Sequence, residues 1–451
     1  MPGPTTPTPD TPTRNEDQVL PQDAIASADG ATPDASVAGE KAATPGTAAS
    51  SSPKVSPFPA KKLAELAPGD PDLQKRLDPI GKDKRFATLS FAVALLDDPT
   101  SPRIPYFGWY DEKQKFGASL VKIAAMTAAY ALRDAVQRAA ENRPADGAED
   151  LLKQITAAWT EPVSNALPEG KPDFPNLLGS NLAGSSLKGI FAVSPAGDEG
   201  QWAIDFTSKQ ILADTTDPIA AMNPSKRRDR YSDINDLADS AKPKDLKFRE
   251  RMELMIGWSD NWFAGTCIDD LGFQYISGCM RALGLFDPQR QLGLWLSSNY
   301  AHRTWSGKGL KLPGDPKDGD KRYQGATARA IMRFLVALAA DKLISETASQ
   351  EMRQLINKTD EAHPPFVGVT SLVKKALGTA RGTIREIDSK VGYLLGNKNL
   401  KVNCSDCAIV TRDLGNGGTK RYGIVVLNIP DENVLTALVQ AIDSALTAAH
   451  A

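Results

Sequence analysis

The chain has 451 residues, with 53 lysines and arginines against 55 aspartates and glutamates and a net charge of -2. This balance gives no electrostatic reason to expect nucleic acid or an anionic membrane as a partner. The longest apolar stretches, such as 91–96 and 331–340, are far too short to cross a bilayer, so no integral membrane segment is expected.

The first 60 residues hold 11 of the 32 prolines and one aromatic residue, Phe58. Such a composition cannot bury enough apolar surface to offset the entropy lost on ordering, so residues 1–60 are predicted to be a disordered spacer. A secretory signal begins with a basic segment followed by an apolar one, and this pattern is not visible at the N-terminus. The compartment stays open.

The folded domain is expected over 61–451, and its first half alternates strand and helix patterns. Short helical pieces are expected at 61–66 and 72–77, then strands at 86–97 and 104–110. Small and apolar residues over 119–140 predict a deeply buried helix. Residues 143–245 mix proline-rich, charged and short apolar stretches, and are expected to form an elaborated insertion.

The second half has the clearer pattern. Helices are expected at 248–257, 262–269, 326–340 and 346–357, and strands at 391–395, 407–412 and 422–428. Asp431 is the expected N-cap of a closing helix. Strands joined by short turns favour an antiparallel sheet, which the buried helix and the closing helix would cover on its two faces.

Four cysteines occur, and Cys404 and Cys407 have C-x-x-C spacing. Metal binding needs more ligands, and His302, His363 and His450 all lie far away in the sequence. Half-buried thiols are therefore favoured over a redox or metal role. The chain also lacks H-E-x-x-H, P-loop and dinucleotide-binding motifs, so no cofactor is expected.

Three short motifs could carry chemistry. Ser119-Leu-Val-Lys122 places a serine and a lysine on one face of a helix start, where a partly neutral lysine can activate the hydroxyl. Ser259-Asp260-Asn261 offers a proton relay and an amide, and Lys390-Val391-Gly392 offers a cation and room for a close approach. Each motif alone is also compatible with a purely structural role. The first could be a solvated helix start, the second an N-cap before 262–269, and the third an exposed strand start.

Taken in this order, S-x-x-K, S-D-N and K-x-G resemble the signature of class A β-lactamases and penicillin-binding proteins. The stretch 325–339 resembles that family's helix before the third motif, and the resemblance covers about 80–450 except 143–245. It implies an α/β fold of the α+β type, β-lactamase/transpeptidase-like, with a five-stranded antiparallel sheet flanked by helices and a mostly helical subdomain. The sequence separation of 140 between Ser119 and Ser259 implies an insertion.

The resemblance also implies a division of roles. Ser119 would form the acyl-enzyme, Lys122 would activate it and Ser259 would shuttle a proton. The substrate would be a small molecule or peptide, namely a β-lactam or a cell-wall peptide, and the family suggests a periplasmic or extracellular location.

By the same resemblance, substrate binding falls to the remaining motif residues. Asn261 and Lys390 would hold the substrate, Lys390 through its carboxylate, and Gly392 would allow its backbone to approach. The oxyanion hole would be the backbone N–H groups of Ser119 and Tyr393.

Two departures from the family pattern stand out. Val391 replaces the usual threonine or serine and removes a hydroxyl expected to bind the substrate carboxylate, at a cost of about 1.5–3 kcal/mol. No glutamate occurs between Glu253 and Glu346, where class A enzymes place the base that activates the deacylating water; His302 and Asp315 lie there instead and are assigned no role. Slow deacylation is therefore expected.

Three hypotheses follow. The first is an acyl-transfer serine hydrolase, closer to a penicillin-binding protein or peptidase than to an efficient β-lactamase. The second is a non-catalytic binding module on the same fold, favoured by Val391 and the missing glutamate but not by the intact motifs. The third is a soluble α/β domain with coincidental motifs, which the match of motif order to strand and helix context disfavours. The oligomeric state stays open.

Overall fold

The structure is a computed structural model. It describes residues 55–67, 69–141, 143–167, 187–197, 201–208, 241–242, 244–290, 292–296, 324–357, 371–378, 384–394, 403–414 and 418–447. The chain divides into two compact units, 1–52 and 53–451, and the second carries all the elements described below. Residues 1–54 lie outside the described residues, so their predicted disorder stays a prediction. Residues 55–60 contact the folded part of the chain.

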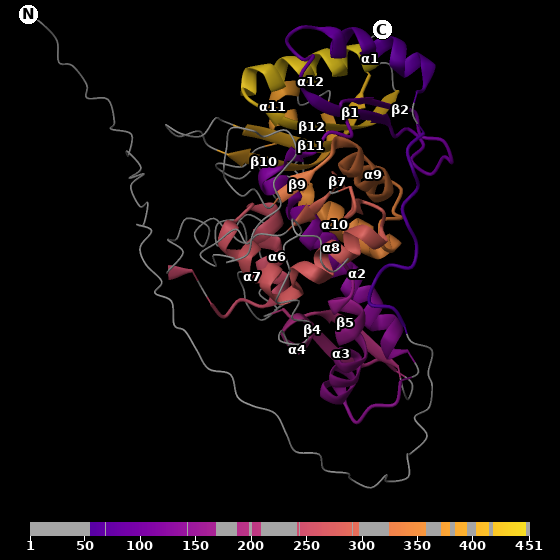
Figure 1. The fold of residues 1–451 in the computed structure, drawn as a ribbon, viewed down its shortest axis with the longest axis vertical. Coiled ribbons are helices and arrows are strands. Elements are labelled where there is room, and N and C mark those ends of the chain that lie inside the picture. Colours follow the sequence, from indigo (N-terminus) through magenta and orange to yellow (C-terminus); the bar gives the residue numbers. More distant parts are fainter. Residues whose placement is uncertain are drawn as a thin grey trace, which may run out of the picture. The chain divides into compact units, whose positions relative to one another are not determined.

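The centre of the fold is a five-stranded antiparallel sheet in the order β10-β11-β12-β1-β2 (Figure 1). Its strands are β1 (Ser90–Leu95), β2 (Tyr106–Trp109), β10 (Ile384–Leu394), β11 (Asn403–Asp413) and β12 (Thr419–Ile429). The predicted α+β class and the five-stranded antiparallel sheet are confirmed. Strand β10 begins seven residues before the predicted start at 391, so Lys390 lies inside the strand rather than at its opening.

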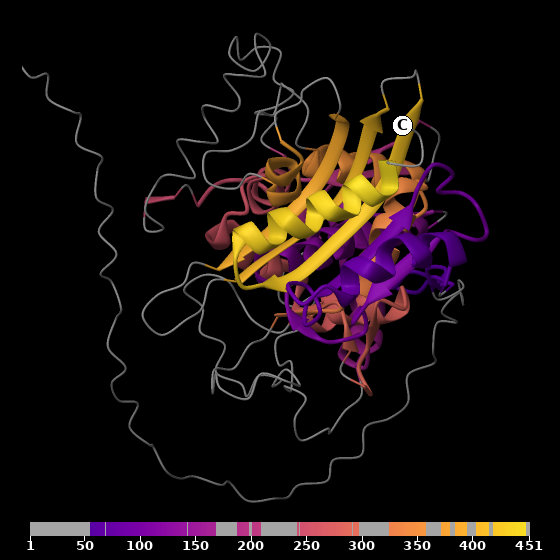
Figure 2. The ribbon, with the colours of Figure 1, turned by 90° about the horizontal axis from the view of Figure 1, so that it is seen from above.

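One face of the sheet is covered by three helices, and α12 runs across the strands when seen from above (Figure 2). These helices are α1 (Pro71–Lys82), α11 (Leu372–Leu377) and α12 (Glu432–Thr447). The buried face of α12 is the predicted one, with Leu435, Leu438, Val439, Ile442 and Leu446 in an apolar cluster with the sheet. Asp431 accepts a hydrogen bond from the Asn433 amide at 2.6 Å, so it does cap this helix.

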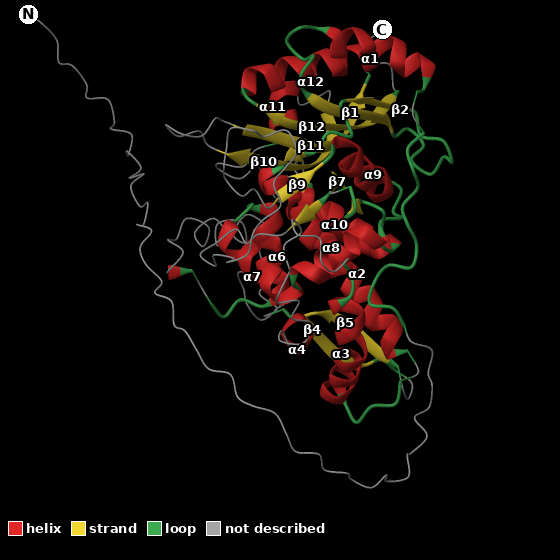
Figure 3. Ribbon diagram, viewed as in Figure 1, coloured by secondary structure: helices red, strands yellow, loops and turns green. Residues whose placement is uncertain are grey.

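The other face packs on a larger group of helices (Figure 3). A 3₁₀ turn, η1 (Ala118–Val121), leads into α2 (Lys122–Ala140), so the predicted helix over 119–140 starts with a tighter turn. Because α2 is rich in alanine, most of it can be enclosed by neighbouring helices. These are α6 (Phe248–Gly257), α7 (Asn261–Leu271), α8 (Phe273–Ala282), α9 (Ala328–Ala339) and α10 (Glu346–Ile356).

The predicted insertion is described only in part. It contains α3 (Ala148–Ser164), α4 (Leu187–Ile190) and a hairpin of β4 (Phe191–Pro195) and β5 (Trp202–Phe206). Short strands complete the described elements: β3 (Lys115–Phe116), β6 (Phe286–Asp287), β7 (Leu292–Gly293), β8 (Trp295–Leu296) and β9 (Gln324–Ala326). None of the described helices is both long and apolar enough to cross a membrane.

The segment 55–67 is extended, so the predicted helix at 61–66 is wrong. Its carbonyl groups are bound by side chains instead of by its own amides. Arg333 donates to Leu63 O at 2.7 Å and to Ala64 O at 3.1 Å, and Tyr275 donates to Pro57 O at 2.9 Å. Helix α1 follows and is longer than predicted, with Asp70 as its N-cap.

Candidate active site

Lys122 is the first residue of α2, and its side chain is fully buried. Its ammonium nitrogen lies 2.8 Å from Asn261 Oδ1 and 3.3 Å from the Asp260 carbonyl oxygen. It also donates to the Ser259 carbonyl and lies 3.5 Å from Ser259 Oγ. The first and second motifs therefore meet around one nitrogen atom, 137 to 139 residues apart in the sequence.

The backbone of the second motif explains this convergence. Ser259 follows α6 with φ of +56°, in the left-handed region that non-glycine residues rarely adopt. This turn lets the Asp260 amide donate to Leu254 O at 3.1 Å and close the end of α6. It directs successive oxygen atoms of the motif toward Lys122. Strain of this kind persists only where surrounding contacts hold it.

Lys390 joins the same group from the sheet. Its side chain is 1% exposed, and its ammonium donates to Ser259 Oγ at 2.7 Å and to the Val391 carbonyl at 3.0 Å. Ser259 Oγ therefore lies between two lysines, one from α2 and one from β10. A hydroxyl in this position can accept a proton on one side and pass one on the other.

Ser119 lies in η1, less than one helical turn before Lys122, and is partly exposed. The residue before it, Ala118, has φ of +46°, a second left-handed residue at this site. Strand β10 passes directly beside η1: a Cβ on Gly392 would come within 2.3 Å of Gly117 O and 2.7 Å of Leu120 N. The missing side chain of Gly392 thus lets β10 lie close to η1, and the expected approach of a substrate to Gly392 stays a prediction.

Asp260 belongs to the second motif and also has the N-cap role that the sequence left as an alternative. Its Oδ1 accepts the Phe263 amide at 3.0 Å, which makes it the N-cap of α7. Its other carboxylate oxygen pairs with Lys242, and both side chains are buried, at 2% and 6% exposure. The motif is therefore a helix cap and a lysine-binding loop at once.

The electrostatics of the site centre on Lys122. Burial lowers the pKa of its ammonium from 10.5 to about 7. The Asp260 carboxylate acts in the opposite direction, and the Lys242 cation lowers the pKa further. Lys122 is therefore neutral in a substantial fraction of molecules near neutral pH, which a lysine acting as a base requires.

Sequence reasoning missed two residues around the site, Lys242 and Asp388. Lys242 lies in the stretch 143–245 that showed no readable pattern, and nothing in its neighbours marked it. Asp388, on β10, is fully buried and accepts from Arg353 Nε at 2.9 Å; burial raises the pKa of this carboxyl to about 6. An aspartate two residues before Lys390 on the same strand face was the one available signal.

Val391 does not face the substrate side in this structure. It is 3% exposed and lies in the apolar cluster under α11, with Val373 and Ala376. The expectation that Val391 removes a carboxylate ligand therefore loses its physical basis, because a hydroxyl at this position would point into the core.

The two cysteines with C-x-x-C spacing lie on the same strand. Cys404 and Cys407 both lie in β11. Cys407 is buried, and burial raises its pKa; the Cys404 side chain lies outside the described residues. Within the described ranges, no group of three histidine, cysteine or acidic side chains is arranged to hold a metal ion. His302, His363, His450 and Asp315 lie outside those ranges.

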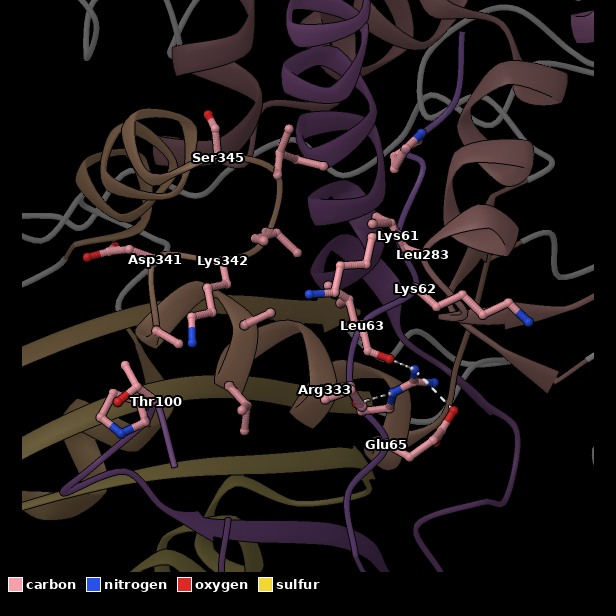
Figure 4. Close-up of a pocket in the computed structure, with 18 of the residues that line it drawn as sticks. Lys61, Lys62, Leu63, Glu65, Thr100, Leu283, Arg333, Asp341, Lys342 and Ser345 are labelled. Atoms are coloured by element: carbon pink, nitrogen blue, oxygen red, sulfur yellow. Dashed lines mark hydrogen bonds and ion pairs between the residues drawn. The ribbon is translucent and has the colours of Figure 1, made fainter. Parts of the chain in front are cut away.

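A cavity of about 660 Å³ lies elsewhere, between the extended segment 59–67, the later turns of α2, and α9 (Figure 4). Lys61 and Lys342 extend into it, and Arg333 and Glu65 lie at one side. Its nearest lining residue on α2, Ala131, lies nine residues after Lys122, about 13 Å along the helix. No motif residue lines this cavity.

Comparisons with known proteins give one family match. Residues 209–398 match the model of the Beta-lactamase enzyme family, a range that includes the second and third motifs but not Ser119 and Lys122. No curated protein sequence matches the chain.

Solved structures also match. The TLA-3 extended-spectrum β-lactamase is 12% identical with a TM-score of 0.45, over 84% of this chain and 100% of that chain. A class A β-lactamase from Bacteroides cellulosilyticus DSM 14838 is 13% identical (TM-score 0.42; 84% and 98%), and a β-lactamase from Sphaerobacter thermophilus DSM 20745 is 16% identical (TM-score 0.42; 83% and 97%). The family match covers less than half of the chain, and the observed five-stranded antiparallel sheet flanked by helices is the fold that the motif resemblance implied.

Proposed function

We propose that this protein is a serine hydrolase that forms an acyl-enzyme on Ser119 with a β-lactam or a peptidoglycan-type peptide. The observation that supports this most is the convergence of Ser259, Asn261 and Lys390 with a buried Lys122 whose pKa is about 7. Coincidental motifs would not be expected to meet at one point from three separate stretches of chain.

In the proposed acylation, the neutral amine of Lys122 accepts the proton of Ser119 Oγ–H. The oxygen attacks the substrate carbonyl carbon, and its charge passes to the carbonyl oxygen, which the Ser119 and Tyr393 N–H groups would bind. The C–N bond then breaks, and the leaving nitrogen takes the Ser259 Oγ proton, which is replaced by the proton that Lys122 took from Ser119. The contact of Lys390 with that hydroxyl supports this relay.

Substrate binding is assigned to the other side of the same group. Lys390 would attract the substrate carboxylate, and Asn261, whose side chain is exposed beyond its contact with Lys122, would hold the substrate amide. Gly392 acts indirectly, because its missing side chain allows β10 to approach η1 closely enough for the oxyanion groups of both to serve one carbonyl.

Deacylation is proposed to be slow. The sequence has no glutamate between Glu253 and Glu346 to activate the hydrolytic water, so the acyl-enzyme should persist. This favours a penicillin-binding or peptidase-like activity over rapid β-lactam hydrolysis.

The test is labelling of the purified chain with a fluorescent penicillin and, separately, a fluorophosphonate, with intact-mass detection. A long-lived adduct on the wild type that is absent in Ser119→Ala supports the proposal. If folded wild-type protein forms no adduct with either probe, the proposal fails and a non-catalytic binding module becomes the better account.

A further variant separates the base from the nucleophile. Lys122→Met should lower the acylation rate constant by about 10²–10⁴-fold, because the base is lost while Ser119 remains. Stopped-flow fluorescence with the penicillin probe measures the rate. A rate within a few-fold of wild type would exclude Lys122 as the base.

A further inference from the structure

Lys242 is a buried cation that the three motifs do not include. Its ammonium pairs with the Asp260 carboxylate and lies 5.7 Å from the centre of the Phe263 ring. The same aspartate, through its backbone carbonyl, accepts a hydrogen bond from Lys122 at 3.3 Å. One residue thus links the two lysines, with its side chain on Lys242 and its backbone on Lys122.

Resting on the proposed function, we infer that Lys242 is a positioning residue for acylation. By pairing with Asp260 it cancels the carboxylate next to Lys122 and keeps the Lys122 amine available as a base. It also fixes the side chain that caps α7, and so holds the loop whose oxygens surround Lys122.

Asp260 and Lys242 act on Lys122 with opposite charges. A nearby carboxylate favours the ammonium form of a lysine and raises its pKa. Asp260 acts on Lys122 in this direction, and Lys242 opposes it. A buried carboxylate without a cation would therefore keep Lys122 protonated and idle near neutral pH.

Other charged groups around Lys122 are engaged with partners of their own. From β10, Lys390 contacts the shared Ser259 hydroxyl. On the helices packed against α2, the nearby acidic side chains bind Ser208, Arg249, Arg251 and Arg133 (Glu250, Glu253, Asp270 and Glu351 respectively). Asp260 and Lys242 are thus the two charged groups whose balance shifts the pKa of Lys122.

The experiment is the pH dependence of the second-order rate constant for acylation by the fluorescent penicillin. For Lys242→Met, the midpoint should rise by about one unit or more, with a roughly tenfold lower rate at pH 7. Lys242→Arg keeps the charge and should keep the midpoint near that of wild type. In Lys242→Met/Asp260→Asn both charges are gone and asparagine still caps α7, so the midpoint should return toward wild type.

A purely structural role would lower the plateau of the profile without moving its midpoint, and that result would overturn the inference. If Lys242→Met does not fold, the single variant Asp260→Asn provides the test. In this variant the Lys242 cation no longer has a carboxylate partner, so the midpoint of the pH profile should fall. An unchanged or raised midpoint contradicts the inference.

Failure of the proposed function is distinguishable. If the wild type forms no adduct on Ser119, NMR titration of ¹³C-labelled lysine side chains, with Lys122→Met for assignment, still reports the Lys122 pKa. An upward shift in Lys242→Met supports the link between the two lysines, and no shift refutes it.

Discussion

Both faces of strand β10 are buried, but one carries the charged Asp388 and Lys390 and the other carries Ile387 and Val391 with the small Ser389 between them. Asp388 and Lys390 lie opposite Ile409 and Cys407 on the face that packs toward α2 and its neighbouring helices, and each is held by a polar partner. On the other face, Ile387 and Val391 pack in the apolar cluster with α11 and α12. The strand thus joins a polar site to an apolar core within four residues.

This difference shows where stability and chemistry are in conflict. The apolar face lowers the free energy by removing side chains from water, whereas each charge on the site face costs desolvation and is tolerated because it is paired. Changes on the site face should therefore alter chemistry or leave an unpaired charge. Changes on the core face should alter stability alone.

The largest expected effect is loss of the Asp388 partner. Arg353→Met should lower the free energy of unfolding by about 3–5 kcal/mol, because it leaves a buried carboxylate without its cation. Chemical denaturation measures it. Glu386→Gln removes the other, more exposed partner of Arg353 and should cost less than about 1 kcal/mol.

The cost of Arg353→Met should also depend on pH. The pKa of Asp388 is raised to about 6, above its value in the unfolded chain, so its stabilising contribution is present at low pH and is lost as the pH rises through 6. Without Arg353 the charged form is still less favourable. The variant should therefore lose more stability at pH 8 than at pH 5, and an equal loss at both would show that Asp388 is not the cause.

The next effect concerns Lys390. Lys390→Ala should slow acylation by a carboxylate-bearing penicillin about 10- to 100-fold, because a hydrogen bond to a charged group is worth about 1.5–3 kcal/mol. Acylation by a fluorophosphonate, which has no carboxylate, should fall much less. Equal losses with the two probes would mean that Lys390 acts through Ser259 rather than by binding substrate.

The smallest effect is expected for Val391→Thr, which restores the residue type usual in the family. The new hydroxyl would lie in the apolar cluster, so the free energy of unfolding should fall by roughly 1–3 kcal/mol without a gain in acylation rate. Thermal denaturation and penicillin labelling measure the two quantities. Faster acylation would show that position 391 faces the substrate and that the assignment of the two faces is wrong.

The sequence predicted those parts of the fold that rest on simple periodicity. The helix at 248–257, the buried face of α12 and the central strands were found because their apolar spacing matches one secondary structure. The extended segment 61–66 was missed because its carbonyls are bound by Arg333, far away in the sequence. The start of β10 was missed because Glu386 and Asp388 interrupt its apolar pattern.

The candidate site was predictable by residue type but not by environment. The motifs identified Ser119, Lys122, Ser259, Asn261 and Lys390, and the structure brings the last four together. Lys242 was not identifiable, because its role depends on a pairing with Asp260 that no spacing encodes. The orientation of Val391 could not be judged either, since it depends on which face of β10 meets α11.

The central claim is that a buried, partly neutral Lys122 activates Ser119. Its most direct test is the rate constant for adduct formation on Ser119 between pH 5 and 9, followed by intact mass and peptide mapping. The account predicts a rate that rises with pH about a midpoint near 7 and is lost in Ser119→Ala. A rate that does not change across this range, or an adduct on another residue, would contradict it.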